Sequence, residues 1–146
     1  VIKSKTAVGV EGIDVFVGMI TSEGNADALA DLSLFMEENE LNGSRAIVWS
    51  QAPILYYMLD IECAIGHFWP SLDSYPYDEF VGDIKEMEEY PMIIYQAMYY
   101  GDLKNEAPTG DEKTEVIHKV LQEGNYEEVF RNEVYAICLP RENSIQ

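Results

Sequence analysis

Apolar positions recur with two spacings along the first half of the chain, and each spacing predicts an element. Residues 5–20 are rich in valine and isoleucine with stretches of period two, which indicates a strand. A helix is expected to begin at Asn25, its N-cap, and to stop at Asn42-Gly43. The apolar positions of this helix are Leu29, Leu32, Phe35 and Met36. Residues 45–69 hold two apolar runs interrupted near Ala52-Pro53, which predicts a hairpin.

The second half of the chain repeats this order. Residues 87–101 have the composition of a strong strand. Thr109 and Glu112 have the spacing of a capping box, and Gly124 would end the helix that follows. The apolar positions of this second helix are Val116, Ile117, Val120 and Leu121. Two extended segments then complete the repeat: YEEVF at 126–130 and NEVYAICL at 132–139.

These elements predict an α+β fold made of two pseudo-symmetric β-α-β-β modules that share an antiparallel sheet. The half-repeats would cover about 1–70 and 85–140, with an acidic linker at about 70–86. A chain of 146 residues suits one domain with a core that needs neither disulfides nor metals. We therefore expect residues 1–146 to form one domain.

The predicted strand at 92–100 is apolar on both faces. Helices would cover one face of a small antiparallel sheet, so the other face must meet a second layer or line a cavity. Ten tyrosines and two tryptophans favour the cavity, because an aromatic ring forms a wall while its polar atom finds a partner. A ligand cleft between the two halves is therefore predicted.

One carboxylate conflicts with this apolar pattern. In RNEVYAICLP (131–140) Glu133 would share a strand face with Tyr135 and Ile137. Burying a carboxylate without a partner costs several kcal/mol or forces it to take up a proton. Two readings remain open: Glu133 waits for a cationic ligand, or it is a turn residue at the exposed end of the strand.

The formal net charge of −18 excludes some partners and favours others. Nucleic acid is a poor partner because phosphate binding needs a basic surface, whereas organic cations and basic proteins are suitable. Residues 73–89 hold seven acids against one lysine, which is typical of a solvated surface. No apolar run is long enough to span a membrane, and no secretory signal is evident, so a cytoplasmic protein is expected.

Few residues offer metal, nucleotide or nucleophilic chemistry. Cys63 and Cys138 lack metal-ligand spacing and are expected to be reduced thiols of the core. His67 and His118 have no partner nearby in sequence, so we expect neither a metal nor a cofactor. Phosphate-binding glycine motifs and a nucleophile elbow are both missing from the sequence.

Aromatic residues and carboxylates on predicted strands are the remaining candidates. A single ring among them is more simply explained as core, but three mid-strand acids beside rings favour a pocket. The candidate ligand-binding residues are Trp49, Tyr57, Glu62, Phe68, Trp69, Tyr95, Tyr99, Glu133 and Tyr135, with Asp60 as a further acid.

Three segments resemble the GyrI-like effector-binding domains, which are ligand-sensing halves of multidrug-responsive transcription activators and also occur as free-standing proteins. NEVYAICL resembles the closing Glu-x-Tyr strand motif of this family. LDIECAIGHFW (59–69) resembles its acidic strand and glycine turn, and PMIIYQAMYYGDL (91–103) resembles the strand that opens its second half. The chain is most similar to the free-standing forms, including those carried on integron gene cassettes.

The resemblance implies two β-α-β-β modules with a hydrophobic cleft between them. It also implies a buried glutamate that takes lipophilic cations among aromatic rings, and this glutamate maps to Glu133. The chain departs from the family at GDLKNEAPTG (101–110), where many members have Gly-Pro-Tyr. No helix-turn-helix module is expected, so any role in transcription would need a separate regulator or protein partner.

Three functions from different classes follow. The first is binding of amphipathic organic cations by Glu133 and rings such as Trp49 and Trp69. The second is hydrolysis of strained electrophiles, with Glu133 as general base and Tyr57 or Tyr99 as proton donor. The third is inhibition of a basic protein partner such as DNA gyrase through acidic residues, although many soluble proteins are acidic for solubility alone.

Overall fold

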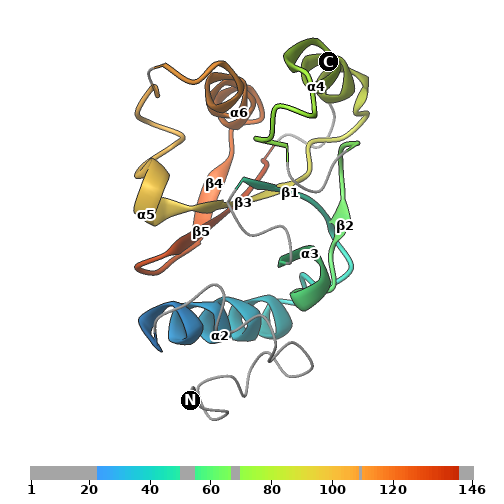
Figure 1. Cartoon of the computed structure of the whole chain (residues 1–146). Helices are drawn as coiled ribbons and strands as arrows, with labels where there is room; N and C mark the ends of the chain where they lie inside the picture. Colours follow the sequence, from blue (N-terminus) through green and yellow to red (C-terminus); the bar gives the residue numbers. More distant parts are fainter. Residues whose placement is uncertain (1–22, 50–54, 67–69, 109, 142–146) are drawn as a thin grey trace.

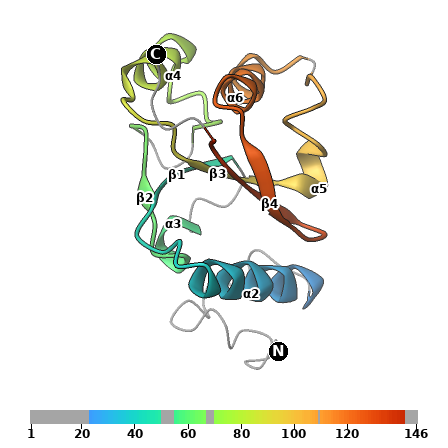
Figure 2. The same cartoon turned by 180° about the vertical axis from the view of Figure 1, so that it is seen from behind.

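In the part of the chain that the structure describes, five strands form one mixed sheet, and helices cover both of its faces (Figure 1 and Figure 2). A computed structural model describes residues 23–49, 55–66, 70–108 and 110–141 of the chain. The described elements are α2 (Glu23–Glu38), β1 (Arg45–Trp49), α3 (Leu55–Met58), β2 (Glu62–Cys63), α4 (Tyr77–Glu86), β3 (Met92–Gln96), α5 (Ala97–Tyr100), α6 (Glu112–Glu123), β4 (Glu127–Arg131) and β5 (Tyr135–Leu139). The predicted strand at 5–20 lies outside the described residues.

The strand order of the sheet is β2-β1-β3-β5-β4. β1 runs parallel to both β2 and β3, whereas β5 is antiparallel to β3 and to β4. Trp49 of β1 pairs with Tyr95 of β3, and Gln96 pairs with Tyr135 of β5. The mixed α and β composition is as expected, but the sheet is mixed where an antiparallel one was predicted.

Alternate side chains of the strands enter two separate hydrophobic cores. Val48, Ile94 and Ile137 face α2 and α3, against Leu32 and Met36. The other sheet face packs against α4 and α6. Its buried residues include Ile47, Trp49, Ile93, Tyr95, Phe80, Ile84, Ile117 and Leu121. The three central strands are therefore buried on both sides, which explains why they are apolar at nearly every position, the exceptions being Arg45 and Gln96 at strand ends.

The predicted ring-lined cleft is not needed to explain β3. Each residue of β3 from Met92 to Gln96 is buried, because helices lie on both faces. The strand ends earlier than predicted, and residues 97–100 form the short helix α5. A cleft was predicted because helices were expected on one face of the sheet only, whereas they cover both.

The predicted hairpin at 45–69 is wrong, because β2 is parallel to β1. A parallel pair requires a crossover connection. That connection contains α3, where Leu55 and Tyr56 are buried on the α2 side of the sheet together with Leu59. In the second half, by contrast, the predicted order of strand, helix and hairpin is confirmed by β3, α6 and the β4–β5 pair.

Two predicted helix starts and the predicted linker also differ from the structure. α2 begins two residues before Asn25, and the N-cap of α6 is Asp111, whereas Thr109 lies outside the described residues. The acidic segment contains α4, which buries Phe80 and Ile84 against the sheet and turns most of its acids outward. Gly124 ends α6 as predicted.

Within the described ranges, none of the helices combines the length and apolarity needed to cross a bilayer.

Candidate functional site

Three of the predicted ligand-binding rings lie in the two cores. Trp49 and Tyr95 are neighbours on the face covered by α4 and α6, and Trp49 packs on Phe80 with 5.6 Å between ring centroids. Tyr135 lies on the opposite face, where burial raises its pKa to about 12. The sheet thus separates Tyr135 from the other two rings, so the three cannot line one cleft.

The remaining described candidates are exposed and lie on different elements. Tyr57 of α3 is 71% exposed and Tyr99 of α5 is 65% exposed. Asp60 and Glu62 are also exposed, at and near the short edge strand β2. Phe68 and Trp69 lie outside the described residues. The structure therefore does not gather these residues into one site.

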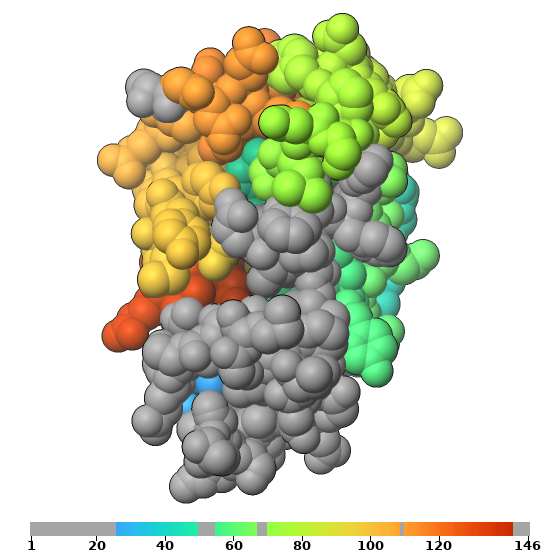
Figure 3. Space-filling model, in the orientation of Figure 1, coloured from blue at the N-terminus to red at the C-terminus, as the bar shows by residue number. Residues whose placement is uncertain are grey.

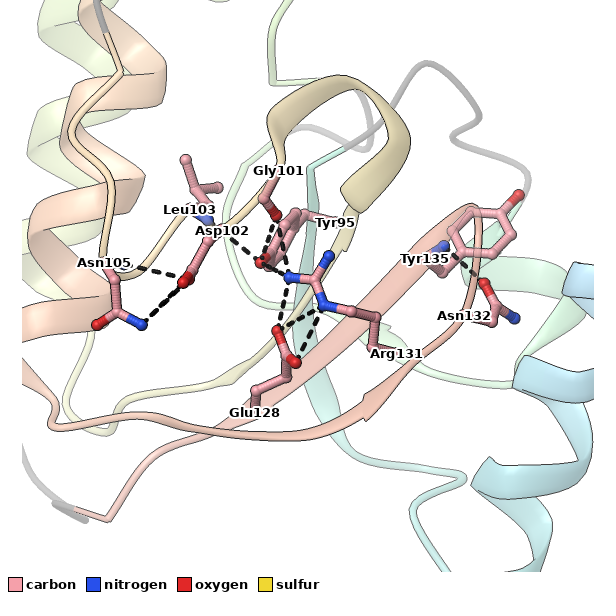
Figure 4. Close-up of polar contacts among 9 residues, drawn as sticks. All are labelled: Tyr95, Gly101, Asp102, Leu103, Asn105, Glu128, Arg131, Asn132 and Tyr135. Atoms are coloured by element: carbon pink, nitrogen blue, oxygen red, sulfur yellow. Dashed lines mark hydrogen bonds and ion pairs between the residues drawn. The ribbon is translucent and has the colours of Figure 1, made fainter.

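Glu133 lies in the turn between β4 and β5, and its side chain is exposed. Asn132 builds this turn, since its Oδ1 accepts from the backbone nitrogens of Val134 (2.9 Å) and Tyr135 (2.8 Å) (Figure 4). Its Nδ2 donates to the carbonyl of Ala28 in α2 at 2.9 Å. Asparagine commonly stabilises turns in this way. The expectation of a buried mid-strand carboxylate is wrong, and the alternative of a turn residue is confirmed.

A different set of residues lines two adjoining hollows beside α4 and α6, which we call the Tyr77 groove. The hollows have volumes of about 480 and 580 Å³, and both are lined by Tyr77 and Glu112. The first is also lined by Ser71, Asp73, Tyr75, Pro76, Gly110, Asp111 and Lys113. The second is also lined by Ala107, Pro108, Glu115, Val116, His118, Lys119 and Gln122. In Figure 3 the surfaces of α6 (orange) and α4 (green) meet at the top of the molecule.

Lys113 holds one wall of the Tyr77 groove in place. Its Nζ donates to the carbonyls of Pro70 and Leu72, each at 2.8 Å, and to that of Tyr75. The ammonium also lies 5.5 Å from the ring centroid of Tyr75 and 5.9 Å from that of Phe80. Burial lowers the pKa of Lys113. The ammonium is thus surrounded by protein acceptors and is not directed at a ligand.

The start of α6 is fixed to the end of β1. Asp111 accepts from the backbone nitrogens of Lys113 (3.2 Å) and Thr114 (3.4 Å), and from the Thr114 hydroxyl at 2.5 Å. The same hydroxyl accepts from the indole nitrogen of Trp49 at 3.1 Å. A side chain that bonds the first free N–H groups stabilises a helix start. The predicted ligand-binding residue Trp49 therefore supports the groove from behind rather than lining it.

A second hollow, which we call the Arg131 recess, lies where the loop after α5 meets β4. Its volume is about 510 Å³. It is lined by Gly101, Asp102, Lys104, Asn105, Asn125, Tyr126, Glu127, Glu128, Arg131 and Arg141. Two ion pairs lie at its wall: Arg131 with Glu128 and Arg141 with Glu127, each at 2.7 Å.

The buried hydroxyl of Tyr95 connects the two sides of the Arg131 recess (Figure 4). It donates to the carbonyl of Gly101 at 3.1 Å and accepts from the nitrogen of Leu103 at 3.2 Å and from Nη2 of Arg131 at 3.0 Å. Burial raises the pKa of Tyr95, and the hydrogen bonds to Glu128 raise the pKa of Arg131. Gly101 has φ +63°, which favours glycine at this bend.

Metal chemistry has no support in the described part of the chain, where no cluster of three histidine, cysteine or acidic residues is arranged to hold an ion. Cys63 and Cys138 are both free thiols, and burial raises the pKa of Cys138 to about 12. Nδ1 of His118 lies 2.7 Å from the carbonyl of Leu103, and it must donate because a carbonyl only accepts. His118 therefore contributes a structural contact.

Comparison with known proteins identifies no relative: no family model, curated protein or solved structure matches the chain. The resemblance to GyrI-like domains stays a prediction.

Proposed function

We propose that the chain binds small amphipathic organic cations and that the Tyr77 groove is the binding site. The observation that carries this proposal is the combination, in one groove, of carboxylates, an aromatic ring and apolar side chains. Glu112 and Tyr77 border both hollows, Asp73 borders the first and Glu115 the second. A cationic, partly hydrophobic molecule is complementary to such a surface.

The carboxylates of the groove are available to a ligand. Within the described ranges, Asp73, Glu112 and Glu115 form no ion pair. The oxygens of Asp111, in contrast, are occupied by the cap of α6. Glu112 and Glu115 also lie in the first turn of α6, where they stabilise the helix start. An incoming cation would therefore meet three carboxylates that have no described side chain at ion-pair distance, although Lys113 and Lys119 belong to the same lining.

The rest of the groove supplies apolar contacts. Tyr77 is 40% exposed, so its ring can cover one face of a ligand. Ala107, Pro108 and Val116 line the second hollow. A cation over an aromatic ring gains about 0.5 to 2 kcal/mol, and burial of hydrocarbon adds roughly 25 cal/mol per Å². Micromolar affinity, about 8 kcal/mol, is within reach of these contributions.

Fluorescence polarisation of a rhodamine-type cation tests the proposal. We expect saturable binding to the wild type and a loss of about tenfold or more in the double variant Glu112→Gln/Glu115→Gln, because two close charges are removed. A neutral dye of similar ring size should be affected less than twofold by the same change.

The matched control is Glu37→Gln/Glu38→Gln on α2. Both residues are exposed, and the change in net charge is the same, but they lie on the opposite side of the sheet. An equal loss in this control would mean that the dye responds only to the overall charge of −18. That result, or a lack of saturable binding to the wild type, would overturn the proposal.

A further inference from the structure

The Arg131 recess gathers three basic residues of a strongly acidic chain, beside the acids Asp102, Glu127 and Glu128. The sequence has nine lysines and arginines, and three of them, Lys104, Arg131 and Arg141, line this single hollow. They come from three separate segments: the loop after α5, the end of β4 and the chain beyond β5. The fold thus brings together cations that are far apart in sequence.

Each of the three cations keeps a hydrogen-bond donor that no described residue accepts from. Arg131 bonds through Nε and Nη2, and Arg141 does the same. Lys104 donates to the carbonyl of Tyr126 and, among the described residues, has no carboxylate within ion-pair distance. Considering only the part of the chain that the structure describes, Nη1 of each arginine and the remaining N–H groups of Lys104 have no protein acceptor. An outside acceptor can therefore bond to them.

The guanidinium of Arg131 is held in place before any ligand arrives. Its Nη2 donates to the Tyr95 hydroxyl and the Gly101 carbonyl, each at 3.0 Å, and to Glu128 at 2.7 Å. The unused nitrogen points away from these three acceptors (Figure 4). A donor that is already oriented loses little conformational entropy on binding.

We propose that the Arg131 recess is a second binding site, which takes a small molecule through a carboxylate or phosphate group. The two arginines are paired with Glu127 and Glu128, and Asp102, which also lines the recess, accepts hydrogen bonds from Asn105. Among the described residues, Lys104 is therefore the basic residue of the lining that has no carboxylate at ion-pair distance. Oxyanions form short, charge-assisted hydrogen bonds with such donors. The acidic surface elsewhere opposes an anion only weakly at physiological salt, where the Debye length is about 8 Å.

Titration followed by amide NMR shifts tests this site. Inorganic phosphate and succinate are added in separate arms, with sodium chloride at equal ionic strength as the reference. We expect saturable shifts at Gly101, Asp102 and Asn125 with at least one of the two oxyanions but not with chloride. The arm that saturates at lower concentration identifies the group that the recess prefers.

Lys104→Met should weaken this binding by about tenfold or more, because a charge-assisted hydrogen bond is lost. Lys104→Arg should keep most of the affinity. Lys85→Met, an exposed lysine of α4 that lines neither the groove nor the recess, is the charge-matched control and should change the affinity less than twofold. The amide spectrum of each variant shows whether it is folded.

Shifts that do not saturate would overturn the proposal, as would equal losses in Lys104→Met and Lys85→Met. Dye binding in the Tyr77 groove uses other residues and a ligand of the opposite charge. The two proposals can therefore fail separately.

Discussion

The Tyr77 groove and the Arg131 recess differ in the charge that they offer, although both border the same helix. The groove follows α6 from its first turn, and the recess begins with Asn125, just after the helix ends. The lysine of the first hollow, Lys113, is surrounded by carbonyls, and the carboxylates of Asp73 and Glu112 are exposed. In the recess the arginines are paired and Lys104 keeps free donors. The difference teaches that the internal partners of each charged group, rather than the net charge of −18, decide what a surface can bind.

Alkaline pH is expected to have the largest effect on stability. It destabilises the fold as a whole and therefore both the groove and the recess. The pKa of Tyr75, which lines the groove, and that of Tyr95, which lies behind the recess, are both raised by burial. The pKa of Tyr135 is raised to about 12 by burial. A group with a raised pKa in the folded state stabilises fully below its unfolded pKa, about 10 for tyrosine, and this stability is lost as the pH rises through the folded value.

We therefore expect the free energy of unfolding to fall by about 2 kcal/mol between pH 10 and pH 12 from Tyr135 alone, since one pKa unit corresponds to about 1.4 kcal/mol and half of the folded molecules have ionised Tyr135 at pH 12. Urea unfolding at several pH values, with tyrosinate absorbance measured in parallel, provides the check. Tyrosines that ionise near pH 10 in the folded protein, with unchanged stability, would contradict this prediction.

Lys113→Met is expected to destabilise the groove and to leave the recess unchanged. The substitution removes three hydrogen bonds to backbone carbonyls but keeps the aliphatic part of the side chain. We expect a loss of about 2 kcal/mol, because hydrogen bonds from a charged donor contribute about 1.5 to 3 kcal/mol each and water replaces some of them. Dye affinity should fall as well, since the 70–75 wall is released.

Urea unfolding and the amide shifts of Gly101 and Asn125 measure the two regions separately in this variant. Lys119→Met, which changes an exposed lysine on the same helix, is the control for stability. Equal destabilisation by both substitutions would show that the carbonyl contacts of Lys113 contribute little.

Glu133→Gln is expected to have the smallest effect. The side chain is exposed and lines neither hollow, so removal of its charge should change dye and oxyanion affinity less than twofold. The same polarisation and NMR titrations provide the measurement. A tenfold loss of dye affinity would instead restore the cation site that the sequence suggested around this residue.

Regular spacing along the chain predicted several elements correctly. Val116, Ile117, Val120 and Leu121 recur at helical spacing, and α6 buries three of them before ending at Gly124. The two strands β4 and β5 were also predicted, because their apolar runs are short and are separated by polar residues. Asn132 was the available signal for the turn: asparagine favours turns, and it directly precedes Glu133.

Other features depend on contacts that no local pattern records. The pairing of β2 with β1 was misread because LYYM is rich in aromatic residues typical of strands, yet it forms α3. The Arg131 recess was missed because positions 104, 131 and 141 meet only after β4 has paired with β5. The Tyr77 groove was missed because Asp73 was interpreted as part of a solvated linker and Glu112 only as part of a capping box.

The irregular register of β4 has a consequence for self-association. β4 is an outer strand among the strands that the structure describes, and its pairing with β5 shifts between Glu128 and Phe130. Such a bulge bends the edge of the sheet. The charged side chains of Glu127 and Arg131 keep this edge hydrated. Both features oppose hydrogen bonding of β4 to a strand of another molecule. On the other side of the described sheet, β2 is only two residues long. Both borders therefore discourage growth into fibrils, and restoring a regular ladder in β4 would remove one of these safeguards.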